Sequence, residues 1–196
     1  MFKPLLFLIV ALCSLFSGIP DAQAEEIPKY HAEAPLPKGW PTPGPYNVVS
    51  DKTFPAYRAA YTPGSLKNFA FMRLFRHIKR EGIPMTSPVE MNMQQKDESL
   101  EMKSMGFMYI DTNVGKIGKD GGKIEVRDVP AMKTLCYTWQ GKNSSASRKI
   151  ANAALAAELK QRGVESTDFR ILGYNGPGVT SDKKTWEMLV VLSAKK

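Results

Sequence analysis

Histidine and cysteine are scarce in this sequence of 196 residues, which contains only two of each. Two cysteines allow at most one disulfide bridge, which excludes a scaffold held together by disulfides. Two histidines are too few for most metallohydrolase sites and make a Ser-His-Asp triad improbable. The sequence also lacks a phosphate-binding loop, a dinucleotide-binding fingerprint and a zinc-ligand pattern. These absences favour a binding protein over the common classes of enzyme.

An apolar run long enough to span a membrane is also missing. The run over residues 5–16 has 12 residues and is broken only by Ser14, whereas a membrane-spanning helix needs about 20. It follows Lys3 and precedes Ala22-Gln23-Ala24, the small-x-small pattern found before a signal-peptide cleavage site. We therefore interpret residues 1–24 as a signal peptide and expect an exported protein, periplasmic or secreted.

The composition is that of an ordinary globular protein, with 43% hydrophobic and 23% charged residues. Lysine and arginine number 27 against 19 acidic residues, which gives a formal net charge of +8. The basic residues are spread along the chain and export removes nucleic acid as a partner, so we expect none. The positive charge instead favours a small anionic ligand or an anionic surface.

Proline is concentrated near the beginning of the chain. Six of the 14 prolines lie within residues 25–45. Such a stretch favours extended backbone without a packed element of its own. We predict a proline-rich linker over residues 25–45, which drapes over or spaces a single domain formed by residues 46–196.

The predicted domain contains an internal repeat. A strand-like run begins at Phe54-Pro55-Ala56 and a second begins 75 residues later, at Val129-Pro130-Ala131. Each is followed by a predicted helix and two further strand-like stretches: 65–82, 84–93 and 104–111 in the first half, and 145–163, 167–174 and 184–194 in the second. The pattern predicts two β-α-β-β units, with two helices on a mostly antiparallel sheet or barrel.

The first predicted helix is apolar over about half of its circumference. A helix that only covers a sheet usually needs a narrower stripe, so one edge is expected to face something other than the core. That edge is formed by Phe71, Met72 and Phe75. The alternative is a core helix that is packed on a wide arc. The other side is basic and solvated, with Arg73, Arg76, Lys79 and Arg80.

Residues 71–78 (FMRLFRHI) and 83–91 (IPMTSPVEM) resemble the SOUL haem-binding protein family. The family pattern is an amphipathic helix, a short turn and a Met-Thr-x-Pro-Val strand, and the similarity extends over about residues 45–194. The resemblance implies an α+β fold, a distorted antiparallel β-barrel built from two β-α-β-β repeats flanked by two helices. Effector-binding domains of bacterial transcription regulators share this fold class, so the fold alone does not decide the function.

The resemblance further implies a binding protein, not an enzyme, that holds haem or another tetrapyrrole in an open hydrophobic groove beside the first helix. A porphyrin is a flat apolar plate with two carboxylates, so it needs an apolar wall and nearby cations. The expected wall is Phe71, Met72 and Phe75, with Met85 at its edge, and the expected propionate partners are Arg76 and Lys79.

Haem iron is held by His, Cys, Met or Tyr side chains. His77 is the only histidine outside the proline-rich segment and lies at the rim of the apolar arc, which makes it the candidate iron ligand. Members of the family need not use an axial histidine, so binding in the groove does not depend on it. Cys136 lies within a strand-like run and is expected to be a small buried apolar residue.

Methionine offers a second kind of site, since thioethers suit Cu(I). Nine methionines follow the signal peptide, among them Met91, Met93, Met102, Met105 and Met108. The alternative is that they fill the core, because Met91 and Met93 share a strand face with Val89.

A hydrolase on the same scaffold is the third hypothesis. Its candidate residues are Glu90 and Glu187, paired with Tyr109 or Tyr137. Glu187 lies between Trp186 and Met188 in an apolar strand, and burial there would raise its pKa. Strand alternation with Trp186 instead favours a solvent-facing Glu187.

Overall fold

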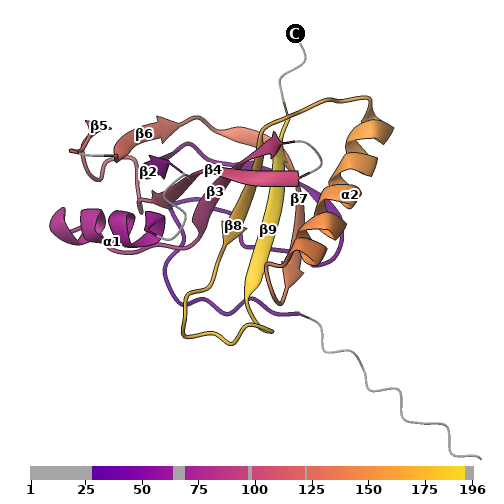
Figure 1. Cartoon of the computed structure of the whole chain (residues 1–196), viewed down its shortest axis with the longest axis horizontal. Helices are drawn as coiled ribbons and strands as arrows, with labels where there is room; N and C mark the ends of the chain where they lie inside the picture. Colours follow the sequence, from indigo (N-terminus) through magenta and orange to yellow (C-terminus); the bar gives the residue numbers. More distant parts are fainter. Residues whose placement is uncertain (1–27, 64–68, 97–98, 122, 193–196) are drawn as a thin grey trace, which may run out of the picture.

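Nine strands and two helices make up the described part of the chain, residues 28–63, 69–96, 99–121 and 123–192 of the computed structural model (Figure 1). In chain order they are β1 (Val49–Phe54), β2 (Tyr57–Pro63), α1 (Ala70–Arg80), β3 (Val89–Lys96), β4 (Ser99–Met108), β5 (Gly118–Lys119), β6 (Glu125–Val129), β7 (Met132–Gln140), α2 (Ser145–Arg162), β8 (Phe169–Gly173) and β9 (Thr185–Val191). The predicted signal peptide, residues 1–24, lies outside the described residues. Neither described helix is long and apolar enough to cross a membrane.

All nine strands belong to one sheet, in the order β1-β7-β9-β8-β3-β4-β2-β6-β5, with antiparallel neighbours throughout. The two repeats meet at its centre, where β3 pairs with β8. The prediction that the sheet closes into a barrel was wrong, because the edge strands β1 and β5 do not pair with each other. The edge strand β5 has only two residues, which offers little backbone for a closing ladder.

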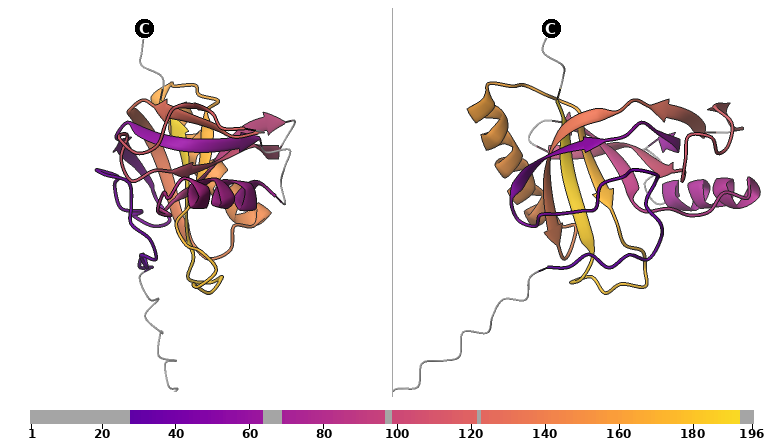
Figure 2. Two further views of the ribbon diagram at one scale, coloured as in Figure 1. Left: turned by 90° about the vertical axis from the view of Figure 1, so that its left-hand side faces the viewer. Right: turned by 180° about the vertical axis from the view of Figure 1, so that it is seen from behind.

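Both helices cover the same face of this sheet, one near each end (Figures 1 and 2). One row of directly paired residues crosses the sheet on that face: Ala60, Phe107, Val89, Gly173, Trp186 and Trp139. At one end of the row Phe107 packs with α1, and at the other Trp139 packs with α2. We call this side the helix face and the other side the open face.

The second helix begins and ends where local sequence signals place it. Ser144 is its N-cap and accepts a hydrogen bond of 3.1 Å from the amide of Ser147, while the Ser147 hydroxyl accepts one of 2.9 Å from the amide of Ser144. Gly163 ends the helix with φ = 62°, a left-handed conformation that glycine adopts without steric cost. The predicted start of α1 at Ser65 lies outside the described residues, and the described helix begins at Ala70.

The open face is covered in part by residues 28–48, which include the predicted linker. Trp40 is only 6% exposed, and its ring lies 4.6 Å from that of Phe54 and 5.1 Å from that of Tyr57. The Ser87 amide donates to the carbonyl of Pro35 over 3.0 Å. The segment has no helix or strand before β1. The apolar side chains between its prolines pack on the sheet, so these side chains are part of the core.

Candidate functional site

The start of α1 exposes an unusual amount of apolar surface. Of the six large hydrophobic side chains that are exposed in the described chain, three lie here: Phe69 is 68%, Phe71 40% and Met72 45% exposed. The buried side of the helix is instead formed by Ala70, Leu74, His77 and Ile78. A cluster of exposed apolar residues on a soluble protein commonly marks a binding surface.

Two aromatic side chains of α1, Phe71 and Phe75, lie next to each other, and we call this pair the aromatic ledge. The rings of Phe71 and Phe75 are nearly parallel, with an interplanar angle of 14° and centroids 6.2 Å apart. Phe71 also contacts Phe107 of β4 edge to face at 5.0 Å, which fixes the ledge to the sheet. The ammonium of Lys79 lies 5.3 Å from the centre of the Phe75 ring. The ledge therefore combines an aromatic, apolar surface with an adjacent cation.

The other predicted groove residues lie around this ledge in different degrees of exposure. Met72 and Arg76 are exposed, whereas Met85 is half-buried and packs against the same core cluster as Phe75. At 100° per residue, Met72, Phe75 and Lys79 share one side of the helix. Arg76 and Lys79 form no ion pair with a carboxylate of the described residues, so both are available to an anion.

His77 is buried, not at the rim where the sequence placed it. It is 3% exposed, its Nε2 lies 2.7 Å from the hydroxyl of Tyr109, and its Nδ1 contacts the carboxylate of Asp120. Both ring nitrogens already have partners, and helical geometry places the imidazole about 160° around the axis from Phe75. The histidine therefore does not face the aromatic ledge as an iron ligand.

The surroundings of His77 bring together three residues of the kinds that bind metal ions. Ligand atoms of His77, Glu81 and Asp120 all lie within 4.8 Å of one another. However, the guanidinium of Arg80 contacts the same Asp120 carboxylate, so a cation already balances that charge.

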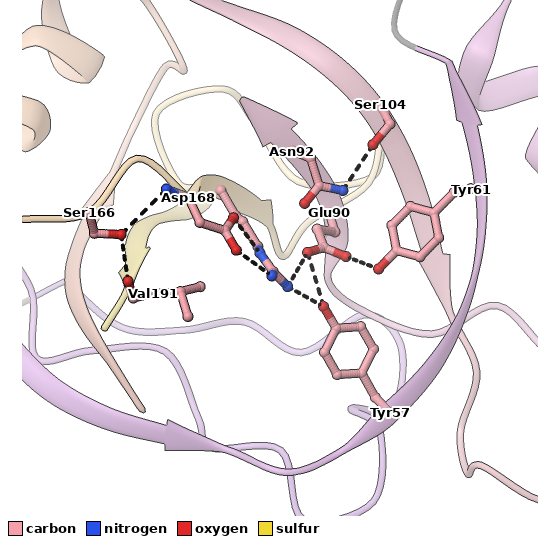
Figure 3. Close-up of polar contacts among 9 residues, drawn as sticks. Tyr57, Tyr61, Glu90, Asn92, Ser104, Ser166, Asp168 and Val191 are labelled. Atoms are coloured by element: carbon pink, nitrogen blue, oxygen red, sulfur yellow. Dashed lines mark hydrogen bonds and ion pairs between the residues drawn. The ribbon is translucent and has the colours of Figure 1, made fainter. Parts of the chain in front are cut away.

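A buried polar network occupies the centre of the open face (Figure 3). Glu90 of β3 is fully buried and accepts hydrogen bonds from Tyr61 at 2.6 Å, from Tyr57 at 3.0 Å and from Arg170 of β8 at 3.0 Å. Burial, followed by the nearby Glu90 carboxylate, raises the pKa of Tyr57 and of Tyr61 well above the usual range. The two hydroxyls therefore stay protonated and act as donors to Glu90.

The second carboxylate proposed for a hydrolase is also buried, so its expected exposure to solvent was wrong. Strand alternation does place Glu187 opposite Trp186, but the open face is covered there. Glu187 accepts hydrogen bonds of 2.8 Å from both Thr138 and Tyr174 and contacts Lys52. The predicted partners Tyr109 and Tyr137 lie on the helix face. The structure thus does not bring the proposed pairs together.

The methionines and the free cysteine have structural roles in the described chain. Met91, Met93 and Met102 pack together in the core cluster beneath α2, whereas Met105 and Met108 belong to two other clusters. These thioethers fill the core. Cys136 is fully buried and unpaired, as expected for a small apolar residue, and burial raises the pKa of its thiol.

Comparisons with known proteins agree on the fold. A family model described as SOUL heme-binding protein matches residues 49–191. A search of curated proteins gave no match. An EcmrR chain in a complex with DNA aligns with a TM-score of 0.54 and 16% identity, over 74% of this chain and 57% of that one, so this chain spans little more than half of it. An uncharacterized conserved protein (TM-score 0.57, 10% identity) and a hydrolase (0.53, 11%), both from Listeria innocua, align over 76% of this chain and 94% of theirs. At these identities the likeness shows a shared fold alone.

Proposed function

This chain belongs to the SOUL haem-binding protein family, and on that premise we propose that it binds haem or another tetrapyrrole against the aromatic ledge of α1. The observation that carries the proposal is the pair of nearly parallel rings of Phe71 and Phe75. The pair lies on the side of α1 where Phe71 and Met72 are exposed to solvent. The family model supports ligand binding over catalysis.

The residues of the ledge fit the chemistry of a porphyrin. Its apolar plate stacks on Phe71 and Phe75, and each such aromatic contact is worth about 0.5–1.5 kcal/mol beyond the buried area. Met72 and Met85 extend the apolar surface beside the rings. The propionates accept charge-assisted hydrogen bonds from Lys79 and Arg76, neither of which has a carboxylate partner in the described chain.

The iron does not require a histidine in this arrangement. His77 keeps its hydrogen bonds to Tyr109 and Asp120 on the buried side of α1. The ledge would therefore bind iron-free protoporphyrin as well as haem, and it would also accept another flat hydrophobic anion.

The test is a titration of the purified protein with haem and with protoporphyrin IX, followed by absorption spectroscopy. We expect saturable one-to-one binding at micromolar concentration. Replacing both Phe71 and Phe75 by alanine should weaken binding at least about tenfold, which corresponds to roughly 1.4 kcal/mol. The matched control is Ile150→Ala, which removes a 60% exposed apolar side chain from α2 and should have no effect. Equal affinities of the double variant and the control would reject the ledge as the site.

We further propose export, which is supported by the sequence of residues 1–24 alone. Cell fractionation together with the mass of the mature protein tests it. A protein that keeps residues 1–24 and stays in the cytoplasm would contradict the signal-peptide interpretation.

A further inference from the structure

A large cleft lies away from the aromatic ledge, on the open face of the sheet. It has a volume of about 1060 Å³, and side chains of six neighbouring strands line it. Tyr61 of β2, Asn92 of β3, Ser104 of β4, Arg127 of β6 and Arg170 of β8 are among them. An adjoining cavity of about 270 Å³ shares four of these residues.

The lining of this cleft carries an excess of positive charge. It includes five cationic side chains, Lys103, Lys119, Lys123, Arg127 and Arg170, against the carboxylates of Glu125 and Asp168. Asp168 is already paired with Arg170. The other four cations form no ion pair with a carboxylate in the part of the chain that the structure describes. Like charges gathered in a cleft attract and concentrate anions from solution.

The two arginines of the cleft differ in what their guanidinium groups are free to do. Both terminal nitrogens of the Arg170 guanidinium are engaged. Nη1 donates to Glu90 at 3.0 Å and to Tyr57 at 2.8 Å, and Nη2 donates to Asp168 at 2.9 Å. Arg127 instead lies over the Tyr61 ring, with its guanidinium carbon 4.3 Å from the ring centre, and makes no ion pair in the described chain. Because Glu90 fixes the Tyr61 ring, Arg127 is positioned while its donors remain available.

Uncharged polar groups complete the floor of the cleft (Figure 3). The amide nitrogen of Asn92 donates to the Ser104 hydroxyl over 2.9 Å. This bond leaves the amide oxygen of Asn92 to accept and the hydroxyl hydrogen of Ser104 to donate. A ligand that fits this floor therefore carries hydroxyl groups beside its negative charges.

We propose that this cleft is a second binding site, for a small organic polyanion with two or more carboxylate or phosphate groups and with hydroxyl groups. Arg127 is the central residue, because its planar fork matches a carboxylate or a phosphate in a bidentate fashion. Lys119 and Lys123 supply further charge beside it. The proposal goes beyond tetrapyrrole binding, and its site is separated from the ledge by the sheet.

Isothermal titration calorimetry of the full chain with citrate and with pyrophosphate tests this site. We expect saturable one-to-one binding of at least one of the two, and the one that binds identifies carboxylate or phosphate as the preferred group. Arg127→Ala should weaken binding about tenfold or more, since it removes the charge-assisted hydrogen bonds of the guanidinium to the ligand. The control Lys149→Ala removes one exposed cation from α2 and should leave the affinity unchanged. Absence of binding by both probes, or equal weakening by the two variants, would overturn the proposal.

Arg127→Lys separates charge from geometry. It keeps the positive charge but loses the planar fork, so its affinity should fall between that of the parent and that of Arg127→Ala. Circular dichroism confirms that each variant is folded, which we expect because Arg127 is exposed.

Titrating the same variants with haem distinguishes the two sites. Arg127→Ala should bind haem normally, and the Phe71 and Phe75 double variant should bind the polyanion normally. An unmodified protein that binds haem but neither citrate nor pyrophosphate rejects this proposal and leaves the ledge unaffected. Competition between citrate and haem, with both lost in Arg127→Ala, would make the cleft the tetrapyrrole site and overturn both assignments.

Discussion

The side chain of Tyr61 crosses directly over Gly106 to reach Glu90. Gly106 of β4 is paired with Tyr61 on one side and with Glu90 on the other. A Cβ atom at Gly106 would lie 2.5 Å from Cε1 of the Tyr61 ring, which is closer than atoms can approach. The missing side chain therefore allows a buried hydrogen bond between strands that are not neighbours.

Replacing Gly106 by alanine should destabilise the protein by about 1–3 kcal/mol, because the methyl group overpacks the site and displaces Tyr61. The free energy of unfolding in urea measures this. Gly176→Ala is the control, since its nearest atom is the Glu33 carboxylate at an ordinary 3.6 Å. A Gly106→Ala variant as stable as this control would show that Tyr61 has room to move.

Replacing either partner of the Glu90–Arg170 ion pair should lower the free energy of unfolding strongly. Glu90 is fully buried and the Arg170 side chain is 11% exposed, so removing one partner leaves an uncompensated charge. We expect Glu90→Leu and Arg170→Leu each to lose about 3–5 kcal/mol of unfolding free energy. The double variant should lose clearly less than the sum, because no charge is then stranded. Additive losses in a double-mutant cycle would contradict a direct interaction.

Stability should fall steeply above pH 10. Burial raises the pKa of Tyr109 to about 12, and burial holds the pKa values of Tyr57, Tyr61 and Tyr174 above their usual range. These raised values make the stabilisation complete below the unfolded tyrosine pKa of about 10, and it is lost as pH rises through the folded pKa values. Each tyrosine contributes a slope of about 1.4 kcal/mol per pH unit within that window.

Urea unfolding at several pH values and the near-ultraviolet absorbance of tyrosinate measure this dependence. We expect the buried tyrosines to ionise together with unfolding, and Tyr57→Phe to make the alkaline decline shallower. Tyrosinate formation near pH 10 with an unchanged circular dichroism spectrum would count against the buried network.

His77→Ala should reduce stability without changing the haem spectrum. The substitution removes the hydrogen bond to Tyr109 and the contact with Asp120, at an expected cost of about 1–3 kcal/mol. His31→Ala is the control, because that side chain is exposed. Loss of the haem absorption band in a fully stable His77→Ala variant would instead identify His77 as an iron ligand.

Trp40 should contribute as much to the free energy of unfolding as a buried residue of the sheet. Trp40→Ala removes packing against Phe54 and Tyr57 and a 3.4 Å hydrogen bond to Tyr174, so we expect a loss of about 3–5 kcal/mol. Val48→Ala, at a 49% exposed side chain, serves as the control. Equal thermal stability of the two variants would mean that the proline-rich segment is only a spacer.

Much of the secondary structure and the family follow from local patterns. The start and end of α2 were predicted to within one residue, because Ser144 and Gly163 act on backbone groups only a few positions away. The order of the repeat and the apolar arc of α1 were also predictable, since both depend on the periodicity of neighbouring residues. Strands β1, β5 and β6 were missed, because β5 has only two residues and β1 and β6 contain only two apolar residues each.

The buried groups of the protein were decided only by its tertiary structure. His77 is buried because Tyr109 and Asp120 come to it from 32 and 43 residues away, and no local signal announces those partners. Glu90 meets Arg170 across 80 residues, since β3 and β8 pair at the centre of the sheet. The sequence by itself determined where helices form and which of their faces are apolar, because these properties arise from adjacent residues. Which polar side chains share a buried site depends on strand neighbours and on the segment that covers the open face, and both are set when the whole chain folds.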